Sequence, residues 1–178
     1  MSFKNYIEPD KEKWGGKRGI LFLPQYKFVY IKRKCEYWRK KNKLFFIFWR
    51  IIYQKYKIKY LIDIPAKAVI GKGFKIEHIG GIVINPEAIL GENVTILNNV
   101  LIGMEKRGKR AGNPQIGNRV YIAAGAVIVG KIKIGNNVLI AANSFVNFDV
   151  PDNSIVIGNK IIPNDFATQG YVLLQGNE

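Results

Sequence analysis

Aliphatic side chains recur at every sixth position through most of the chain. The series runs through Ile64, Ile70 and Ile76, then Ile84, Leu90, Ile96 and Ile102, then Ile116, Ile122, Ile128, Ile134, Ile140 and Val146. The residue after each is often glycine, alanine or asparagine, and the fourth after it is small or β-branched. An amphipathic helix repeats at about 3.6 residues and a strand at two. A period of six therefore predicts a solenoid of short flat strands, each pointing one large aliphatic side chain inward.

Three hexads make one turn of such a solenoid, so side chains 18 positions apart should stack. The stacked pairs are Ile84 with Ile102, Ile116 with Ile134, and Ile122 with Ile140. A set of unrelated sandwich strands is the alternative, but its pattern has period two with turns every 8 to 12 residues. We predict an all-β parallel β-helix over residues 63–165, an α-helical segment over 1–62 and a C-terminal tail over 166–178.

The repeat is interrupted twice. Eight residues separate Ile76 from Ile84, which places two extra residues in the turn that contains the only histidine, His78. Fourteen residues separate Ile102 from Ile116, and residues 104–114 between them read as a basic, glycine-bearing loop. Departures from a regular solenoid are where function is expected, because the repeat itself is needed only for packing.

Charge and aromatic residues divide the chain near residue 62. Of the net charge of +15, residues 1–62 contribute +13, with 17 basic and 4 acidic side chains. Those residues also hold 16 of the 22 aromatic side chains, whereas 15 of the 18 glycines come later. The basic character therefore belongs to the N-terminal segment, and the solenoid is close to neutral.

The pattern over residues 35–61 predicts an amphipathic helix. Its aromatic face comprises Trp38, Phe45, Phe48, Ile52 and Tyr56, widened by Phe46, Trp49 and Tyr53. The simplest interpretation is a helix packed across the first coil, where it caps the aliphatic column. A basic interfacial helix on an anionic membrane is a second interpretation. Nucleic-acid binding also uses basic residues among aromatics, but we do not expect it beside a solenoid of this kind.

Other classes of protein are excluded by composition. One cysteine, Cys35, cannot make a disulfide framework, a cysteine zinc site or an iron–sulfur cluster, and we expect no metal. We find no pattern of a secretory signal, and the longest apolar run, Leu44–Trp49, is far shorter than the roughly 20 residues of a spanning helix. We expect a cytoplasmic protein, with the inner membrane face as an alternative site.

Short segments of the solenoid resemble a known family. They are Asp63-Ile64-Pro65, Gly71-Lys72-Gly73, Glu77 to Ile84, Ile96 to Gly103, Asn113-Pro114 and Ile122 to Ala126. From Asp63 to about Val150 the chain resembles the catalytic domain of serine acetyltransferases, in the hexapeptide-repeat (left-handed β-helix) acyltransferase superfamily. The resemblance implies a left-handed coil, acetyl-CoA as co-substrate, and a homotrimer with active sites in clefts between subunits.

The resemblance also implies the catalytic pair. The spacing of fifteen residues between Asp63 and His78 matches the family's pair. There the histidine takes the proton from the acceptor hydroxyl as it attacks the thioester, and the aspartate supports the imidazolium. A hydroxyl is a poor nucleophile, so general-base assistance is worth about 10² to 10⁴ in rate. On residue type alone, His78 reads as a surface or core residue and Asp63 as a turn residue before Pro65.

Coenzyme A positions carry over from the family in the same way. Small residues that let the pantetheine arm approach the backbone match Gly103, Ala124 and Ala142, with Met104 in place of a second glycine. The loop cations Lys106, Arg107, Lys109 and Arg110 fit either the 3′-phosphate, an anionic glycan or a simply solvated loop. Lys160 is a further candidate for the phosphate.

Departures from the family pattern bear on the acceptor. Glu77 stands where the family has aspartate, and Gly112-Asn113 where it has Arg-His. A serine carboxylate would lose its cationic partner at Gly112 unless Arg110 replaced it. Together with the different N-terminal segment, this favours a sugar hydroxyl as acceptor, held by Glu77, Asn113 and Arg110.

Three functions follow from these patterns. The first is an acetyl-CoA-dependent O-acetyltransferase of capsular or other surface polysaccharide, nearest to short polysaccharide O-acetyltransferases. The second is serine O-acetyltransferase of cysteine biosynthesis. The third is a catalytically silent solenoid that binds anionic surfaces. Thiol release from acetyl-CoA with candidate acceptors separates the three.

Overall fold

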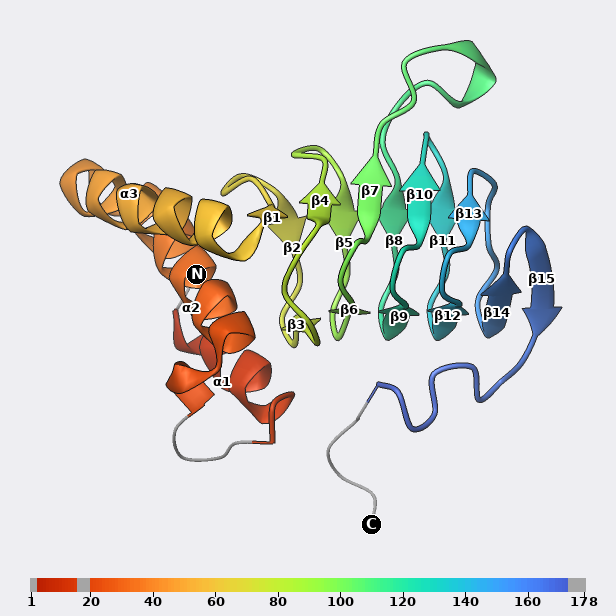
Figure 1. The fold of residues 1–178 in the computed structure, drawn as a ribbon, viewed down its shortest axis with the longest axis horizontal. Coiled ribbons are helices and arrows are strands. Elements are labelled where there is room, and N and C mark those ends of the chain that lie inside the picture. Colours follow the sequence, from red (N-terminus) through yellow and green to blue (C-terminus); the bar gives the residue numbers. More distant parts are fainter. Residues whose placement is uncertain (1–2, 16–19, 173–178) are drawn as a thin grey trace.

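The computed structural model describes residues 3–15 and 20–172, which form a helical part followed by a solenoid (Figure 1). The helical part comprises α1 (Lys4–Glu12), a short 3₁₀ turn η1 (Ile20–Phe22), α2 (Pro24–Arg39) and α3 (Lys43–Tyr60). Helix α3 begins at Asn42, whose side chain accepts from the backbone N–H groups of Leu44 and Phe45, and ends at Leu61 in the left-handed conformation. The helical part therefore ends where the charge pattern changes.

The solenoid has three parallel faces, here called sheets A, B and C. Sheet A consists of β1 (Ile62–Asp63), β4 (Ile82–Ile84), β7 (Leu101–Gly103), β10 (Val127–Val129) and β13 (Phe145–Val146). Sheet B consists of β2 (Val69–Ile70), β5 (Ile89–Leu90), β8 (Gln115–Ile116) and β11 (Lys133–Ile134). Sheet C consists of β3 (Lys75–Ile76), β6 (Thr95–Ile96), β9 (Val120–Ile122), β12 (Val138–Ile140), β14 (Ser154–Ile157) and the antiparallel β15 (Lys160–Pro163). The chain visits A, B and C in turn, about five times, which confirms the predicted parallel β-helix.

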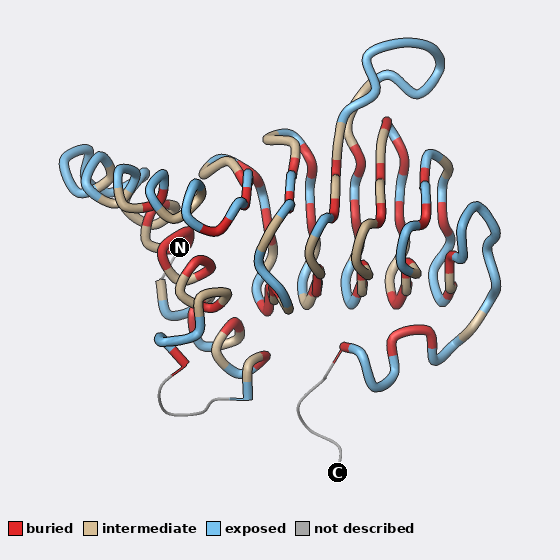
Figure 2. Tube along the Cα trace, in the orientation of Figure 1, coloured by how far each residue is buried: buried red, intermediate tan, exposed pale blue. Residues whose placement is uncertain are grey.

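The register confirms the predicted stacking. Ile84 pairs with Ile102 between β4 and β7, and Ile116 pairs with Ile134 between β8 and β11. All thirteen aliphatic residues of the six-residue series are buried and form one column (Figure 2). Burial of this apolar surface is the main stabilising contribution in the solenoid.

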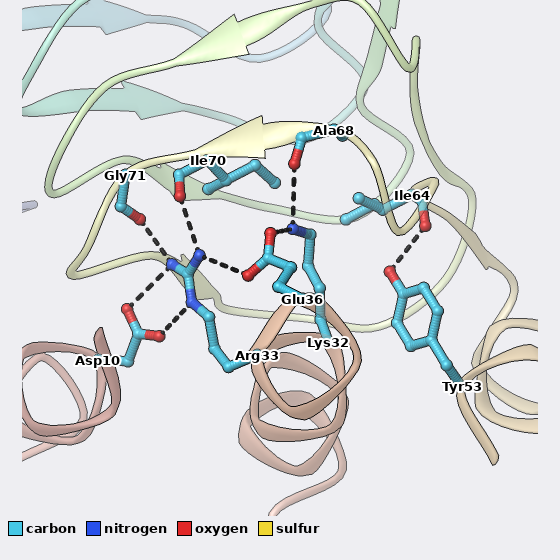
Figure 3. Close-up of polar contacts among 9 residues, drawn as sticks. All are labelled: Asp10, Lys32, Arg33, Glu36, Tyr53, Ile64, Ala68, Ile70 and Gly71. Atoms are coloured by element: carbon cyan, nitrogen blue, oxygen red, sulfur yellow. Dashed lines mark hydrogen bonds and ion pairs between the residues drawn. The ribbon is translucent and has the colours of Figure 1, made fainter. Parts of the chain in front are cut away.

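Helix α2 covers the open end of the column with buried charges (Figure 3). Arg33 donates to the carbonyls of Ile70 and Gly71, at 2.9 and 2.6 Å, and is ion-paired with Asp10. Lys32 donates to the carbonyl of Ala68 and is ion-paired with Glu36. Strand β2 is the first strand of sheet B and has no strand beyond it. These two side chains therefore satisfy carbonyls at an edge that would otherwise be unpaired.

Helix α3 packs at the same end with part of the predicted face, since Trp49, Ile52 and Tyr56 are partly buried against the core. The hydroxyl of Tyr53 donates to the carbonyl of Ile64 at 2.7 Å, and Tyr60 is also buried. Phe45 and Phe48, predicted to face the solenoid, are 52% and 56% exposed. Trp38 lies in α2, because the predicted single helix is interrupted between Arg39 and Lys43. The predicted cap is therefore built by α2 and α3 together, and one side of α3 remains outside.

The C-terminal segment turns back after the β14–β15 hairpin. Thr168 donates its hydroxyl to the side-chain oxygen of Asn137 at 2.6 Å, and Ala167 is buried. Tyr171 packs against Tyr121 of β9. The first part of the predicted tail, residues 166–172, thus contacts the solenoid, while residues 173–178 lie outside the described residues. Within the described ranges, no helix has the length and apolar character needed to cross a membrane.

Candidate active site

His78 lies in the turn that leads from β3 of sheet C to β4 of sheet A. Gly80 and Gly81 in this turn have φ values of +108° and +65°, and a side chain at Gly81 would collide with Asn99 of the next coil. The extra residues are accommodated in this way while the stack continues through a hydrogen bond from Asn99 N–H to the carbonyl of Gly80. His78 is exposed, and no hydrogen bond to another described residue holds it. Its imidazole is therefore free to meet a substrate.

Sheet A presents an apolar outer row that ends at a carboxylate. The paired residues along the outer face are Asp63, Val83, Leu101, Val127 and Phe145. Because side chains alternate across a strand, the inward partners of this row are the buried isoleucines. Asp63 thus stands at one end of a continuous apolar strip, on the sheet that the His78 turn enters.

Two acidic residues predicted to be functional have cationic partners within the chain. The carboxylate of Asp63 lies 2.6 Å from Lys57 Nζ of α3 and is exposed. The carboxylate of Glu77 lies 2.7 Å from Lys75 Nζ, and its backbone carbonyl accepts from Gln25. Burial raises the pKa of Tyr121, with a further contribution from the nearby Glu77. Glu77 therefore faces sheet C, while Asp63 and His78 are not joined by a hydrogen bond among the described residues.

The positions predicted for coenzyme A divide into two groups. Ala124 and Ala142 lie in the turns from sheet C to sheet A, two and three coils further along the corner that carries His78. Gly103 ends β7 on sheet A and pairs with Val129, and Met104 beside it is 44% exposed. Lys160 starts β15 opposite Ile157, and Gly158 in the same hairpin turn donates to Ser144 Oγ, in the turn that contains Ala142. The structure thus gathers the small residues around sheet A and places Lys160 at the end of the same corner.

The basic loop extends away from the solenoid between β7 and β8 (Figure 1). Its base is closed by a bridge between Glu105 and Gly112, and its tip is a 3₁₀ turn, η2 (Gly108–Arg110). Every side chain from Lys106 to Arg110 is exposed. Asn113 at the base donates to the carboxylate of Glu87 at 3.1 Å, and its side-chain oxygen is buried with no hydrogen-bond partner in the described structure.

Lys131 is a residue of this region that the sequence patterns did not single out. Its N–H donates to the carbonyl of Arg110 at 2.8 Å. A Cβ on Gly112, whose φ is +136°, would lie 3.0 Å from Cβ of Lys131, so the lysine stem runs along the glycine. Only the three-dimensional approach of the loop base to the next coil reveals this cation, because Gly112 and Lys131 are 19 positions apart in the chain.

Two cavities lie between the helices and the first coil, and neither is lined by His78. One has Arg33, Tyr37, Lys67 and Ile70 among its walls, and the other Arg50, Tyr53 and Pro65. His78 itself and Ile79 beside it are exposed in a single chain. In the part of the chain that the structure describes, no three His, Cys, Asp or Glu side chains gather closely enough to hold a metal ion.

A family model and curated proteins match this region. The family model described as bacterial transferase hexapeptide (six repeats) matches residues 113–147. Serine acetyltransferase of Staphylococcus aureus (strain Mu50) is 45% identical over 113 residues, which cover 62% of this chain and 51% of the relative. Serine acetyltransferase 4 of Arabidopsis thaliana is 35% identical over 144 residues, covering 80% of this chain and 38% of the relative. The chain spans about half the length, or less, of these relatives.

Solved structures agree with the curated relatives. Serine acetyltransferase from Brucella abortus has a TM-score of 0.73 and 26% identity, covering 89% of this chain and 68% of that one. Soybean serine acetyltransferase complexed with serine has a TM-score of 0.75 and 26% identity, covering 90% and 69%. Coverage of this extent includes part of the helical segment as well as the solenoid.

These similarities overturn the predicted polysaccharide acceptor. The expectation of a capsular or surface-polysaccharide enzyme was wrong, because the similar proteins and structures are serine acetyltransferases. That expectation rested on the absence of a cationic side chain at position 112 and on an N-terminal segment different from that of serine acetyltransferases. The side-chain stem of Lys131 runs beside Gly112, and the matched structures extend over part of the helical segment. The second of the three predicted functions is therefore favoured.

Proposed function

We propose that this chain, a hexapeptide-repeat β-helix similar to serine acetyltransferases, is an acetyl-CoA-dependent serine O-acetyltransferase. The observation that carries the proposal is the placement of the Asp63 and His78 motif around the outer face of sheet A. This motif lies within a chain that is 45% identical to a serine acetyltransferase over 113 residues.

The reaction needs no covalent enzyme intermediate. His78 accepts the proton of the serine hydroxyl as its oxygen bonds to the thioester carbon, and the bond from that carbon to sulfur then breaks. The proton passes from the imidazolium to the departing thiolate, which leaves as coenzyme A. A base positioned for this transfer contributes about 10² to 10⁴ in rate. Asp63 supports the imidazolium, and its pairing with Lys57 would have to loosen for that role.

Acceptor and cofactor contacts follow from the same face. The serine carboxylate is assigned to Lys131, to Arg110 at the end of η2, whose carbonyl accepts from Lys131, and to Asn113 at the loop base. The pantetheine arm is assigned to the corner of Ala124 and Ala142 and to Gly103, since small residues permit a close backbone approach. Met104 borders this path, and Lys160, in the hairpin beside the Ala142 turn, is a candidate for the 3′-phosphate.

We further propose a cytoplasmic homotrimer. His78 is exposed in a single chain, and a neighbouring subunit would supply a wall opposite it. Closed cyclic assemblies repeat such a contact at each interface. Glu77, which is paired with Lys75 on sheet C, is placed outside the acceptor contacts of its own chain.

The test is thiol release from acetyl-CoA with L-serine, with L-threonine and with no acceptor. Serine-dependent release is expected, and His78→Ala should lower kcat/KM by about 10² to 10⁴. The melting temperature should not change, because the side chain is exposed and has no hydrogen bond among the described residues. Asn147→Ala, another exposed turn substitution, serves as the control. If the protein bound acetyl-CoA but did not acetylate serine, serine would be excluded as the acceptor. If it did not bind coenzyme A, the catalytically silent solenoid would be the remaining function.

A further inference from the structure

The outer side of α3 exposes a row of large apolar side chains. Six large aliphatic or aromatic side chains within its 18 residues are at least 45% exposed: Leu44, Phe45, Ile47, Phe48, Ile51 and Ile58. Five of them, all except Phe45, fall within a narrow arc when the helix is wound at 3.6 residues per turn. The helix projects away from the solenoid (Figure 1), and its outer surface is exposed along most of its length (Figure 2).

This apolar arc lies opposite the face that packs on the protein. Tyr53 and Tyr60, on the inner face, are 2% and 8% exposed. A helix that is apolar on two opposite faces normally has partners on both. An exposed contiguous patch of this kind marks an interaction surface. The inner partner is the first coil and α2, so the outer partner must come from outside the chain.

The charges around the arc indicate what that partner is. Helix α3 contains five cations and no acidic residue: Lys43, Arg50, Lys55, Lys57 and Lys59. Lys55 lies within the arc, Lys59 borders one side and Arg50 the other. Only Lys57 has an ion-pair partner among the described residues, which is Asp63. The helix therefore combines an apolar stripe with cations that remain available.

A second copy of the chain is a poor match for this surface. Two such helices placed face to face would bring together ten cations with no carboxylate from either helix. The rest of the chain offers no strongly acidic surface, since residues 63–178 carry a net charge of +2. Like charges at an interface oppose association. A bilayer with anionic lipids, in contrast, accepts apolar side chains below its headgroups and attracts cations at its surface.

We infer that the outer face of α3 binds an anionic membrane surface, with the helix lying flat in the interface. An 18-residue helix is about 27 Å long, and within the described residues none can cross the membrane. Leu44, Phe48 and Ile51 enter the headgroup region, and Lys55 and Lys59 contact lipid phosphates. The inference does not depend on acetyl transfer, because no residue of α3 is assigned to coenzyme A or the acceptor.

Co-sedimentation of the full chain with vesicles tests the inference. Binding is expected to mixed phosphatidylcholine and phosphatidylglycerol vesicles, with much less to phosphatidylcholine alone, and it should weaken as salt is raised. The double variant Phe48→Ser with Ile51→Ser should bind at least about tenfold more weakly. Lys55→Gln and Lys59→Gln should each weaken binding roughly fivefold. Far-UV circular dichroism verifies that each variant folds.

Matched controls change equally exposed residues elsewhere. Phe166→Ser removes a side chain that is 71% exposed, and Lys133→Gln removes an exposed cation of the solenoid, and neither should alter binding. No binding of the unaltered chain to anionic vesicles at low salt would overturn the inference. Equal binding by the apolar double variant would overturn it too. So would a lower oligomeric mass of that variant without vesicles, which would identify the face as a contact between copies.

Discussion

Asp63 has one partner in the structure, Lys57, and another in the proposed mechanism, His78. Its carboxylate is ion-paired with Lys57 of α3, whereas the proposed chemistry requires it to support His78. The pair is exposed on the aspartate side, so it contributes at most about 1 kcal/mol to stability. Such a weak contact can be exchanged when substrate is bound.

Substituting the two partners separately distinguishes these roles. Asp63→Asn should lower kcat roughly tenfold to a hundredfold, as removal of a supporting partner does at other sites, with little change in melting temperature. Lys57→Gln should leave kcat unchanged, because it removes only the ion pair. Steady-state kinetics and thermal melts of both variants provide the measurement. Equal losses of kcat in the two would mean that Asp63 acts through α3 rather than through the histidine.

Arg33 is the residue on which the capping contact most depends. Burial alone would lower its pKa, but the carboxylates of Asp10 and Glu36 outweigh burial and raise it. Arg33→Met would leave Asp10 buried without its partner and two carbonyls without donors. We expect a loss of about 3–5 kcal/mol in the free energy of unfolding. Urea denaturation measures this, and the exposed Arg39→Met should change stability by less than about 0.5 kcal/mol.

Lys13 should make the free energy of unfolding depend on pH in the alkaline range. Burial, with repulsion from Lys75, lowers its pKa from 10.5 to about 8, although Glu77 acts in the opposite direction. Between about pH 8 and pH 10.5 Lys13 is protonated in the unfolded chain and neutral in the folded chain. The free energy of unfolding therefore increases with pH across this range, and the gain is lost as pH falls to about 8. The unfolding free energy of the unaltered chain, relative to Lys13→Met, should therefore be larger at about pH 9.5 than at about pH 7.5. A difference that is independent of pH would contradict this.

At the scale of elements, two glycines of the solenoid have different reasons to be glycine. A Cβ on Gly71 would collide with the backbone carbonyl of Gly91 in the next coil. A Cβ on Gly103 would meet only side chains, those of Val129 at 3.3 Å and Leu101 at 3.5 Å. The first glycine is required by the distance between coils, and the second leaves space on the outer face of sheet A.

Alanine at each position should therefore affect different properties. Gly71→Ala should lower the unfolding free energy by about 1–3 kcal/mol, because backbone atoms must move. Gly103→Ala should change it by less than about 1 kcal/mol, yet raise the KM for acetyl-CoA roughly tenfold if the pantetheine arm passes there. Denaturation and kinetics on both variants check the expectation. An unchanged KM in Gly103→Ala would remove that residue from the cofactor path.

The solenoid could be predicted from sequence because one spacing fixes both burial and register. Ile84 and Ile102 are 18 residues apart and stack for that reason alone. The cap could not be predicted at the same detail, since the pattern of α2 does not reveal that Lys32 and Arg33 are buried against strand carbonyls. Phe48 was predicted to pack inward because aromatic spacing identifies a face but not its partner. Lys131 was missed because its contact with Gly112 depends on where the loop returns.

At the scale of the whole molecule, the exposure of His78 in a single chain makes a prediction about assembly. If each active site combines His78 of one subunit with the loop base of its neighbour, two inactive variants should restore activity in mixed trimers. The variants are His78→Ala and the double substitution Arg110→Ala with Lys131→Ala, each expected to be nearly inactive with serine. An intact interface needs His78 from the loop variant and the loop cations from the His78→Ala variant. In an unselected random mixture about a quarter of the interfaces meet this condition.

Co-expression with two affinity tags isolates the mixed trimers, and sedimentation should give a mass three times the 20.2 kDa of the chain. Restored turnover near a third of the unaltered level supports shared sites, because every mixed trimer has one intact interface among its three, whereas a site within one chain would give none. Mixing the two purified variants without exchange of subunits is the control and should remain inactive. A mixed trimer without activity would place His78 and the loop cations in the same chain's site, and an active monomer would show that no neighbouring wall is needed.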